Sequence, residues 1–459
     1  MGTTEQLCRI ISRTRFSNLG AATVARTIEA IKDGIAVALA GCDEAPVRLY
    51  AQHIRSLGGA RASSAWGQGF KSSTVQAATI NAMATHVLDF EPMWTPPTHA
   101  VSPTVPVAFA LAEAMKRNGR ELVAAVAKGM EVQARLLLAG SQFQPEALRF
   151  HPPGVAGVLG AAVTAGHLLG LNEHKLRHAL GIAGSRAGSL LANAGSMTKC
   201  THPGYAAGLG LDAALLAARG FTGNPDILEA HKGFAETFFP DGFDAAPLLA
   251  YGRPFRVVDP GLAIKLFPSQ FGTHYAISAA LRMHARLGGA GEIARVTITT
   301  PVMQYVDRPQ PASGLDGKFS FQYTAAAALL DGKVDIDTFT DKRRFRADMV
   351  ALLGKIRLIQ TDAIPGEWRA MRVEIEATLR DGRRERALCD GPSGSWGHPL
   401  GAGDHLRKLD DCLGRHMPAA RVKRLLDAID ALPRGRPGAV ATIVKLIAAR
   451  RASPRRRAA

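Results

Sequence analysis

The chain is short of aromatic residues and of long apolar runs, and each shortage argues against a class of protein. Aromatic residues make up only 6% of the 459 residues. No basic stretch interleaved with aromatic residues and no known nucleic-acid motif occurs, so we expect no nucleic-acid binding although the formal net charge is +17. No uncharged apolar run approaches the roughly 20 residues that a membrane-spanning helix needs, so we also expect no membrane association.

Cysteine is scarce, and the cysteines are scattered along the chain. The five cysteines are never in a C-x-x-C pair, which argues against a disulfide framework and against a thiolate zinc site. No H-E-x-x-H or EF-hand pattern occurs, so we expect no metal. The beginning of the chain lacks a basic region followed by an apolar run and a cleavage site. We therefore expect a reducing, cytoplasmic setting.

Acidic residues are outnumbered by basic ones, 39 against 56. Such an excess favours partners that are nucleic acids, anionic membranes or small acidic molecules, and the preceding observations leave the last class. Part of the excess lies in residues 450–457, which hold five arginines. We interpret this C-terminal block as a solvated terminus.

Apolar residues are abundant, at 47% of the chain, and the length favours two domains. Residues 1–265 have one helical pattern after another, with apolar positions about 3.6 residues apart over 24–39, 121–138 and 155–169. Alanine and glycine fill many expected contact positions, and neither a dinucleotide-binding nor a P-loop motif occurs. These residues therefore predict a tightly packed all-α domain.

The pattern changes after Gly261. Residues 295–300 and 371–379 alternate apolar and polar side chains, which predicts strands with one buried face, and a hairpin-type turn follows the second strand. Helical patterns lie between the two strands and return beyond residue 396. We predict a mainly α fold in which a helical domain, residues 1–265 and 396–459, contains an inserted α+β lid domain, residues 266–395.

The most conspicuous polar stretch is residues 85–99. It holds His86, His99, Asp89 and Glu91 within fifteen residues, and three prolines prevent it from being regular helix. A proline-stiffened loop of ionisable residues between two apolar helices is a common way to display reactive groups. The alternative is a surface loop with a capping aspartate and solvated histidines.

Four further stretches combine ionisable groups with glycine or proline. Lys199 stands just before a helix start and could bind an anion with the free N–H groups there, or be a solvated loop lysine. His274 lies where the α+β domain begins and faces an interdomain cleft or makes a structural hydrogen bond. Tyr323 stands three residues after Ser320, at the start of an alanine-rich helical stretch. It either contributes its hydroxyl to a site or is an ordinary packed aromatic residue behind a serine N-cap. His151 opens a helix rich in small residues and is a site residue or only a cap.

These stretches, taken in order, resemble the MmgE/PrpD family, which includes 2-methylcitrate dehydratase, cis-aconitate decarboxylase and iminodisuccinate epimerase. The resemblance covers nearly the whole chain. It rests on seven segments: His86-x-x-Asp89-Phe90, Thr98-His99, Gly129-Met-Glu131-Val-x-x-Arg135, Lys199-x-x-His202-x-Gly204, Gly220-Phe-Thr-Gly223, Lys265-x-Phe-Pro268 with Thr273-His274, and Lys318-Phe-Ser-Phe-Gln-Tyr323. It implies the same two-domain fold, a homodimer, and no organic cofactor or metal.

The resemblance also implies which residues form the site. The catalytic residues would be Asp89, His99, Lys199, His274 and Tyr323, and the substrate-binding residues would be His86, His151, His202 and Lys265. These residue types suit a small polycarboxylate. A lysine and a protonated histidine can stabilise the negative charge that builds up beside a carboxylate, and a histidine can exchange a proton near neutral pH.

The sequence departs from the family pattern at two places. Glu91, Pro92 and Met93 stand where the family often has two aspartates and a threonine, and Ala100 replaces the usual proline after the loop histidine. A polar contact expected from the threonine position is therefore missing at Met93, which bears on the substrate.

Three functions remain compatible with the sequence. The first is a cofactor-independent lyase, either a dehydratase or a decarboxylase, that acts on a small di- or tricarboxylate. The second is an epimerase of an iminodisuccinate-like dicarboxylate, which needs only removal and return of a proton. The third is a catalytically silent binding protein, against which the retention of all five catalytic positions argues.

Overall fold

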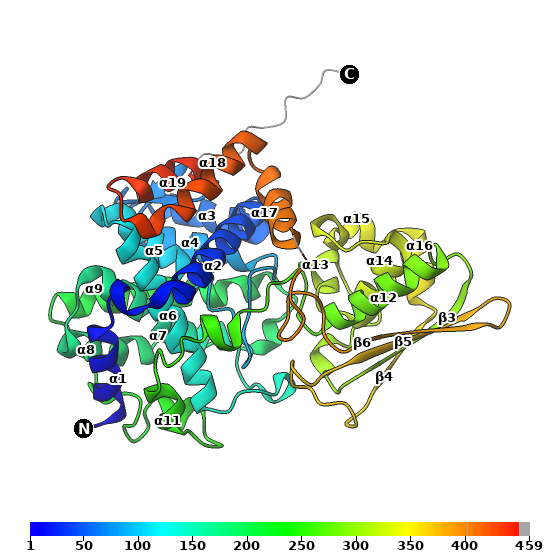
Figure 1. Ribbon diagram of the computed structural model, residues 1–459, viewed down its shortest axis with the longest axis horizontal. Helices are drawn as coiled ribbons and strands as arrows, with labels where there is room; N and C mark the ends of the chain where they lie inside the picture. Colours follow the sequence, from blue (N-terminus) through cyan, green and yellow to red (C-terminus); the bar gives the residue numbers. More distant parts are fainter. Residues whose placement is uncertain (402, 449–459) are drawn as a thin grey trace.

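The computed structural model describes residues 1–401 and 403–448. It is 56% helix and 9% strand, so the prediction of a mainly α fold is confirmed. The C-terminal arginine block lies outside the described residues. Figure 1 shows a larger helical part and a smaller part that contains helices and a sheet.

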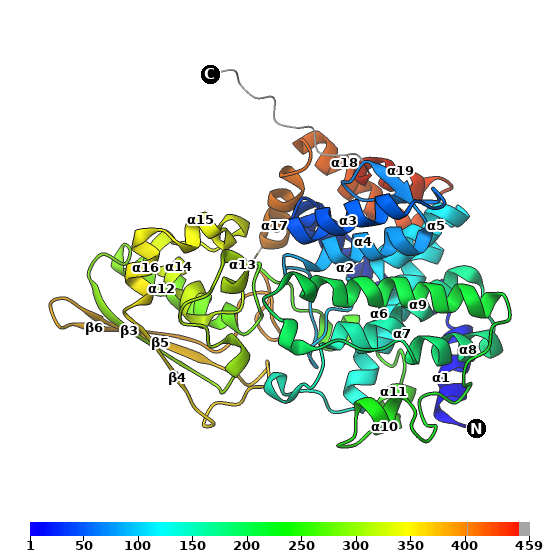
Figure 2. The ribbon, with the colours of Figure 1, turned by 180° about the vertical axis from the view of Figure 1, so that it is seen from behind.

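The helical part comes from both ends of the chain. Its N-terminal helices are α1 (Thr3–Arg13), α2 (Gly20–Gly41), α3 (Ala45–Leu57), α4 (Thr74–His86), α5 (Val105–Met115), α6 (Gly119–Ala139), α7 (Pro152–Leu169), α8 (Glu173–Gly184), α9 (Thr201–Ala218), α10 (Phe234–Phe238) and α11 (Ala245–Leu249). Its C-terminal helices are α17 (Asp404–Gly414), α18 (Ala419–Asp430) and α19 (Ala439–Ile447). The C-terminal helices lie beside α2 and α5 in both views (Figures 1 and 2). A short hairpin, β1 (Ser63–Ala65) with β2 (Phe70–Ser72), joins α3 to α4.

Small residues allow the central helices to pack closely. A Cβ atom at Gly210 of α9 would lie 2.3 Å from the carbonyl oxygen of Val158 on α7, and one at Gly129 of α6 would lie 1.9 Å from Thr164 Oγ1. Larger side chains would therefore force these helices apart. Helix α7 is long and apolar enough to cross a membrane, so the expectation that the sequence holds no apolar run of about that length is wrong. Because 89% of the helix is buried inside the protein, its packing accounts for its composition.

The smaller part contains a four-stranded sheet covered on one face by helices. The strands are β3 (Ile293–Thr300), β4 (Ile356–Gln360), β5 (Val373–Leu379) and β6 (Arg384–Cys389), in the order β4-β3-β5-β6. Strands β3 and β4 are parallel and the other pairs are antiparallel, with Ile298 opposite Ile375. The helices are α12 (Thr273–Leu287), α13 (Gly314–Gly317), α14 (Phe321–Asp331), α15 (Asp341–Arg344) and α16 (Ala347–Leu353), and α12, α14 and α16 lie over one face of the sheet (Figure 1).

Each part has its own apolar core. The larger core takes residues from Leu7 to Val257 and from Leu409 to Ile447. The smaller takes residues from Ala263 to Cys389 and adds Met93 and Ala194 from the helical part. The two cores therefore meet beside the loop that contains Met93.

Candidate active site

The loop after α4 is held where the two parts meet. Helix α4 ends at His86, and the chain turns sharply because Asp89 adopts a left-handed backbone conformation with φ of 50°. Aspartate tolerates this conformation better than most residues do. Further on, the backbones of Met93 and Ala263 exchange hydrogen bonds of 3.1 and 2.9 Å. The loop is thus fixed to the segment that leads into the smaller part.

Asp89 is held between two lysines. Lys199 Nζ donates to Asp89 Oδ2 at 2.6 Å, and Lys265 Nζ donates to Asp89 Oδ1 and, at 2.9 Å, to its backbone carbonyl. All three side chains are buried. Burial alone would raise the pKa of Asp89, but the charges of Lys199 and Lys265 outweigh it and hold that pKa well below its usual value. Asp89 is therefore a carboxylate at neutral pH.

His86 connects this ion pair to a second carboxylate. Its Nδ1 lies 2.5 Å from Glu91 Oε1, and its Nε2 lies 3.0 Å from Lys199 Nζ. Because an ammonium can only donate, Nε2 must accept and Nδ1 must carry the proton. Burial and the charge of Lys199 lower the pKa of His86 to about 4, so its ring is neutral at pH 7. Lys199 is consequently fixed by two partners and points in one direction.

His99 is the loop histidine that lines a cavity. Its Nδ1 lies 3.3 Å from Glu91 Oε1 and its Nε2 lies 3.7 Å from Asp89 Oδ1. The ring is 8% exposed, and its centroid is 4.7 Å from that of His86. A histidine beside two carboxylates and at a cavity wall is well suited to exchange a proton with a bound molecule.

Two further histidines complete this side of the site. His151, the residue before α7, has its Nδ1 3.1 Å from Nδ1 of His202 on the first turn of α9. Burial and the nearby charge of Lys199 lower the pKa of His202 to about 4 and hold that of His151 well below its usual value. One of the two rings therefore donates and the other accepts.

A cavity lies against these groups, between the two parts of the chain. From the helical part it is lined by polar and apolar residues: Asp89, Met93, Pro97, Thr98, His99, Pro145, Leu148, His151, Pro152, Pro153, Leu191, Ala194 and Lys199. From the lid it is lined by Gln270, Phe271, Tyr305, Phe319 and Trp368. Ionisable side chains of the helical part and aromatic side chains of the smaller part therefore line the same cavity.

The charges around the cavity are mainly positive. Three buried ammonium groups, on Lys199, Lys265 and Lys318, face two buried carboxylates, on Asp89 and Glu91. These lysines outnumber the carboxylates by one, and an anionic ligand would offset this excess of positive charge. Only Lys199 among the lysines lines the cavity; Lys318 donates to the carbonyls of Leu88 and Pro268, and burial lowers its pKa to about 8.

The structure brings together only part of the residue set predicted from the sequence. Asp89, His99, Lys199 and His151 line the cavity, whereas His86, His202 and Lys265 lie directly behind them. Lys199 is only 8% exposed, so the alternative of a solvated loop lysine is wrong.

His274 and Tyr323 do not line the cavity. His274 is buried with its ring centroid 5.2 Å from those of Phe267 and Phe271, and its Nε2 has no partner among the described residues. Tyr323 is fully buried in the lid core, and its hydroxyl donates to the Thr338 carbonyl at 2.5 Å. Of the five catalytic candidates, Asp89, His99 and Lys199 therefore line the cavity, whereas His274 and Tyr323 do not.

Several residues of the site had no sequence signal. Tyr305 lines the cavity and accepts a 2.6 Å hydrogen bond from Gln270, while Phe319 lies over Lys199 with the Nζ 5.1 Å from the ring centroid. Glu91 was named in the polar stretch 85–99 and as a departure from the family pattern but was given no role, yet it lies against both His86 and His99. Its charge next to two histidines was the signal that could have revealed this role.

One group at the site has the composition of a metal site. The nitrogen and oxygen atoms of His86, Glu91 and His99 lie within 4.8 Å of one another. However, His86 and Glu91 already bond directly, and the ammonium of Lys199, 3.0 Å from His86, would repel a cation. The arrangement fits acid–base chemistry on an anion better than metal binding.

Comparisons with known proteins place the chain in a family. Residues 5–245 match the MmgE/PrpD N-terminal domain, and residues 267–433 match the MmgE/PrpD C-terminal domain. The cis-aconitate decarboxylase of Mus musculus is 32% identical over 442 residues, which cover 94% of this chain and 90% of that protein. The cis-aconitate decarboxylase of Homo sapiens is 33% identical over 87% of this chain and 85% of its own length. The 2-methylcitrate dehydratase of Cupriavidus necator is 28% identical over 69% and 70%.

Proposed function

The chain belongs to the MmgE/PrpD family, and on that basis we propose that it is a lyase that decarboxylates cis-aconitate or a closely similar unsaturated tricarboxylate. The observation that carries the proposal is that Lys199, His99 and His151 line one cavity between the two parts of the chain. Two relatives that match most of the chain are cis-aconitate decarboxylases, which supports this choice of substrate.

Lys199 would bind a carboxylate of the substrate. Its Nζ is hydrogen-bonded to Asp89 and His86 and lies over the apolar ring of Phe319. A fixed charge in such surroundings stabilises developing negative charge strongly, because it needs no reorganisation during the reaction.

The reaction requires one bond to break and one proton to arrive. Loss of CO₂ from the CH₂–carboxylate of cis-aconitate leaves an electron pair that forms a new C=C bond. The electron pair of the old double bond moves to the carbon beside the neighbouring carboxylate, where it accepts a proton. His99, whose nitrogens lie 3.7 Å from Asp89 and 3.3 Å from Glu91, would donate that proton. These steps use only side chains of this chain.

Met93 favours decarboxylation over dehydration. Dehydration expels a hydroxyl group, which a site normally holds by a hydrogen bond. Met93 lines the cavity where the family often has a threonine, and its thioether is at best a weak acceptor. A substrate without a hydroxyl group has no hydrogen bond to lose at Met93.

The proposal is tested by incubating the purified protein separately with cis-aconitate, 2-methylcitrate, citrate and iminodisuccinate and following each by NMR. We expect turnover of cis-aconitate with release of CO₂. Faster dehydration of 2-methylcitrate or citrate would contradict the decarboxylase assignment, and epimerisation of iminodisuccinate alone would contradict the lyase assignment.

A further inference from the structure

A second cluster of ionisable side chains lies in the helical part and shares no residue with the cavity. It consists of Cys42, Asp43 and His416. Cys42 and Asp43 follow the last residue of α2, and His416 stands two residues after the end of α17. The cluster thus joins segments that are 374 residues apart in the sequence.

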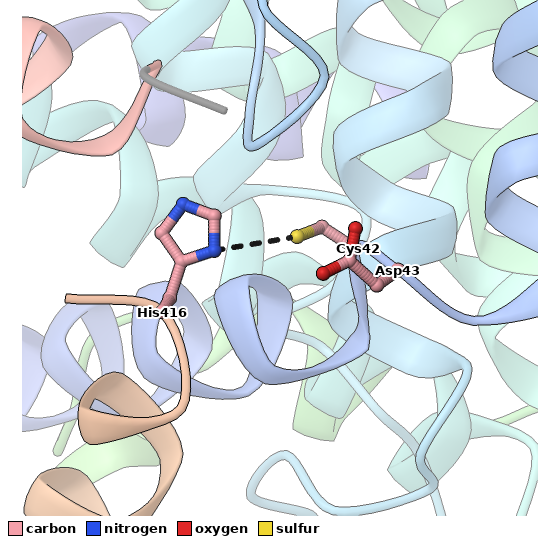
Figure 3. Close-up of side chains that lie close together, drawn as sticks. All are labelled: Cys42, Asp43 and His416. Carbon is pink, nitrogen blue, oxygen red and sulfur yellow. Dashed lines mark hydrogen bonds between the residues drawn. The ribbon is translucent and has the colours of Figure 1, made fainter. Parts of the chain in front are cut away.

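The spacing of the three side chains fits a metal ion. Cys42 Sγ lies 3.8 Å from His416 Nδ1 (Figure 3), and an oxygen of Asp43 lies within 4.8 Å of both. In a tetrahedral zinc site, bonds of about 2.3 Å to sulfur and about 2.0 Å to nitrogen place these two ligand atoms roughly 3.5 Å apart. The observed separation therefore needs only a small adjustment to admit an ion.

The surroundings hold the ligands in place. Cys42 Sγ donates to the Leu39 carbonyl at 3.1 Å, and Gln68 Nε2 donates to the Cys42 carbonyl at 2.6 Å. Gly67 packs against both ends of the cluster, since a Cβ atom there would lie 2.4 Å from Cys42 Sγ and 3.3 Å from a carbon of the His416 ring. Only a residue without a side chain allows this approach.

The three residues differ in exposure in a way that permits an ion to enter. Cys42 is fully buried, His416 is partly buried and Asp43 is exposed. A cation can reach the cluster from the side of Asp43 and bind the buried sulfur last. Thiolate, imidazole and carboxylate together are a donor set typical of zinc.

We propose that Cys42, Asp43 and His416 bind a zinc-like divalent cation, with water as a further ligand, and that the ion ties α17 to the end of α2. Binding releases the thiol proton of Cys42 to solvent, because the thiolate is the metal ligand. The spacing rules applied to the sequence did not reveal this site, since its ligands come from opposite ends of the chain.

The test uses the full chain, freed of metal with a chelator and titrated with Co²⁺. Cobalt bound to a thiolate gives a near-ultraviolet charge-transfer absorption, which a site made only of histidine and carboxylate does not give. We expect this absorption to saturate at one equivalent and to disappear on addition of Zn²⁺. Zn²⁺ should also raise Tm by a few degrees, because it binds the folded state.

The variants separate this site from chance binding. Cys42→Ser should abolish the absorption. His416→Gln and Asp43→Asn should each weaken Co²⁺ binding at least ~10-fold, since loss of even an outer-shell contact to a metal ligand costs that much. Cys389→Ser, which replaces a buried cysteine of the smaller part, is the matched control and should leave the cobalt–thiolate absorption unchanged. If Cys42→Ser folds poorly, the partly exposed His416 and the exposed Asp43 still provide the test. Absence of the absorption, or its persistence at full strength in His416→Gln and Asp43→Asn, would overturn the proposal.

Discussion

Lys199 and Asp89 are 110 residues apart in the sequence, and the ammonium of one donates to the carboxylate of the other at 2.6 Å inside the protein. Asp89 has a second ammonium partner in Lys265, so Lys199 is not needed to neutralise it. Since Lys199 is also the lysine at the cavity wall, its charge remains available to a bound carboxylate.

We expect Lys199→Ala to lower kcat/KM for the substrate at least ~10²-fold, because a charged partner in a desolvated site is worth roughly 2–4 kcal/mol in the transition state. Lys199→Arg should recover part of this loss, as a guanidinium is larger and differently shaped. Lys333→Ala, which removes an exposed lysine paired with Asp335, is the control and should leave turnover unchanged. Full activity of Lys199→Ala would exclude the proposed carboxylate contact.

Glu91 should affect the rate more than substrate binding. It does not line the cavity but holds His86 and lies beside His99, so it is a positioning residue. Glu91→Gln should lower kcat by ~10- to 100-fold, in the range of a supporting contact to a general acid, with little change in KM. It should also shift the pH profile of kcat, which a purely structural role would not do. An unchanged pH profile would count against this role.

Stability should fall between pH 7.5 and 5.5 because of the buried histidines. The pKa of His86 is about 4 when folded and about 6.5 when unfolded. The unfolded state therefore takes up the proton first, and stability is lost as pH falls through 6.5. At pH 5.5 this single group costs about 1 kcal/mol. The difference in Tm between the two pH values should be smaller in His86→Gln than in the wild type; an equal difference would show that His86 is protonated in the folded protein.

The sequence predicted the elements well and the side-chain contacts unevenly. Helical periodicity located α2, α6 and α7. Helices α6 and α7 are buried along most of their length and on most of their surface. The edge strand β4 was missed because it has only five residues and is partly exposed. The parallel pairing of β3 with β4 was equally invisible, as it depends on the crossover between them.

Tyr323 illustrates why a site cannot be read from residue type alone. Ser320 caps α14 by accepting from the Tyr323 backbone N–H at 2.9 Å, which was the alternative considered from the sequence. Because of its position on α14, the Tyr323 side chain points into the core of the smaller part. The tyrosine at the cavity is Tyr305, which stands in a short 3₁₀ turn with no distinguishing pattern.

Substituting Met93 should change which substrate is preferred. Met93→Thr restores a hydroxyl group at the cavity wall, where a hydroxy acid could form a hydrogen bond worth about 1 kcal/mol. The ratio of kcat/KM for 2-methylcitrate to that for cis-aconitate should therefore rise by ~5- to 10-fold. Met93→Leu, which keeps the wall apolar, is the matched control. A fall in the ratio for Met93→Thr would contradict the proposed role of this position.

We also predict a homodimer formed through the helical part, with the lid at the periphery. Tyr205 and Leu209 of α9 are 47% and 36% exposed, and Tyr50 of α3 packs against Tyr205 with ring centroids 6.0 Å apart. This forms an apolar face that association would cover. Light scattering should give twice the monomer mass for the wild type and a lower mass for Leu209→Asp. Phe345→Glu, an exposed lid position, should remain dimeric; a wild-type monomer at micromolar concentration would refute the prediction.

The central claim is that this site removes CO₂ from an unsaturated tricarboxylate and delivers one proton from the protein. The most direct measurement is NMR of cis-aconitate incubated with the purified protein in D₂O. We predict release of one CO₂ per substrate molecule. The product should carry one deuterium on the carbon that gains the proton, which is the carbon bonded to the neighbouring carboxylate. The Lys199→Ala protein should form this product at least ~10²-fold more slowly. Recovery of unchanged cis-aconitate, or a hydrated product that retains all three carboxylates, would contradict the account.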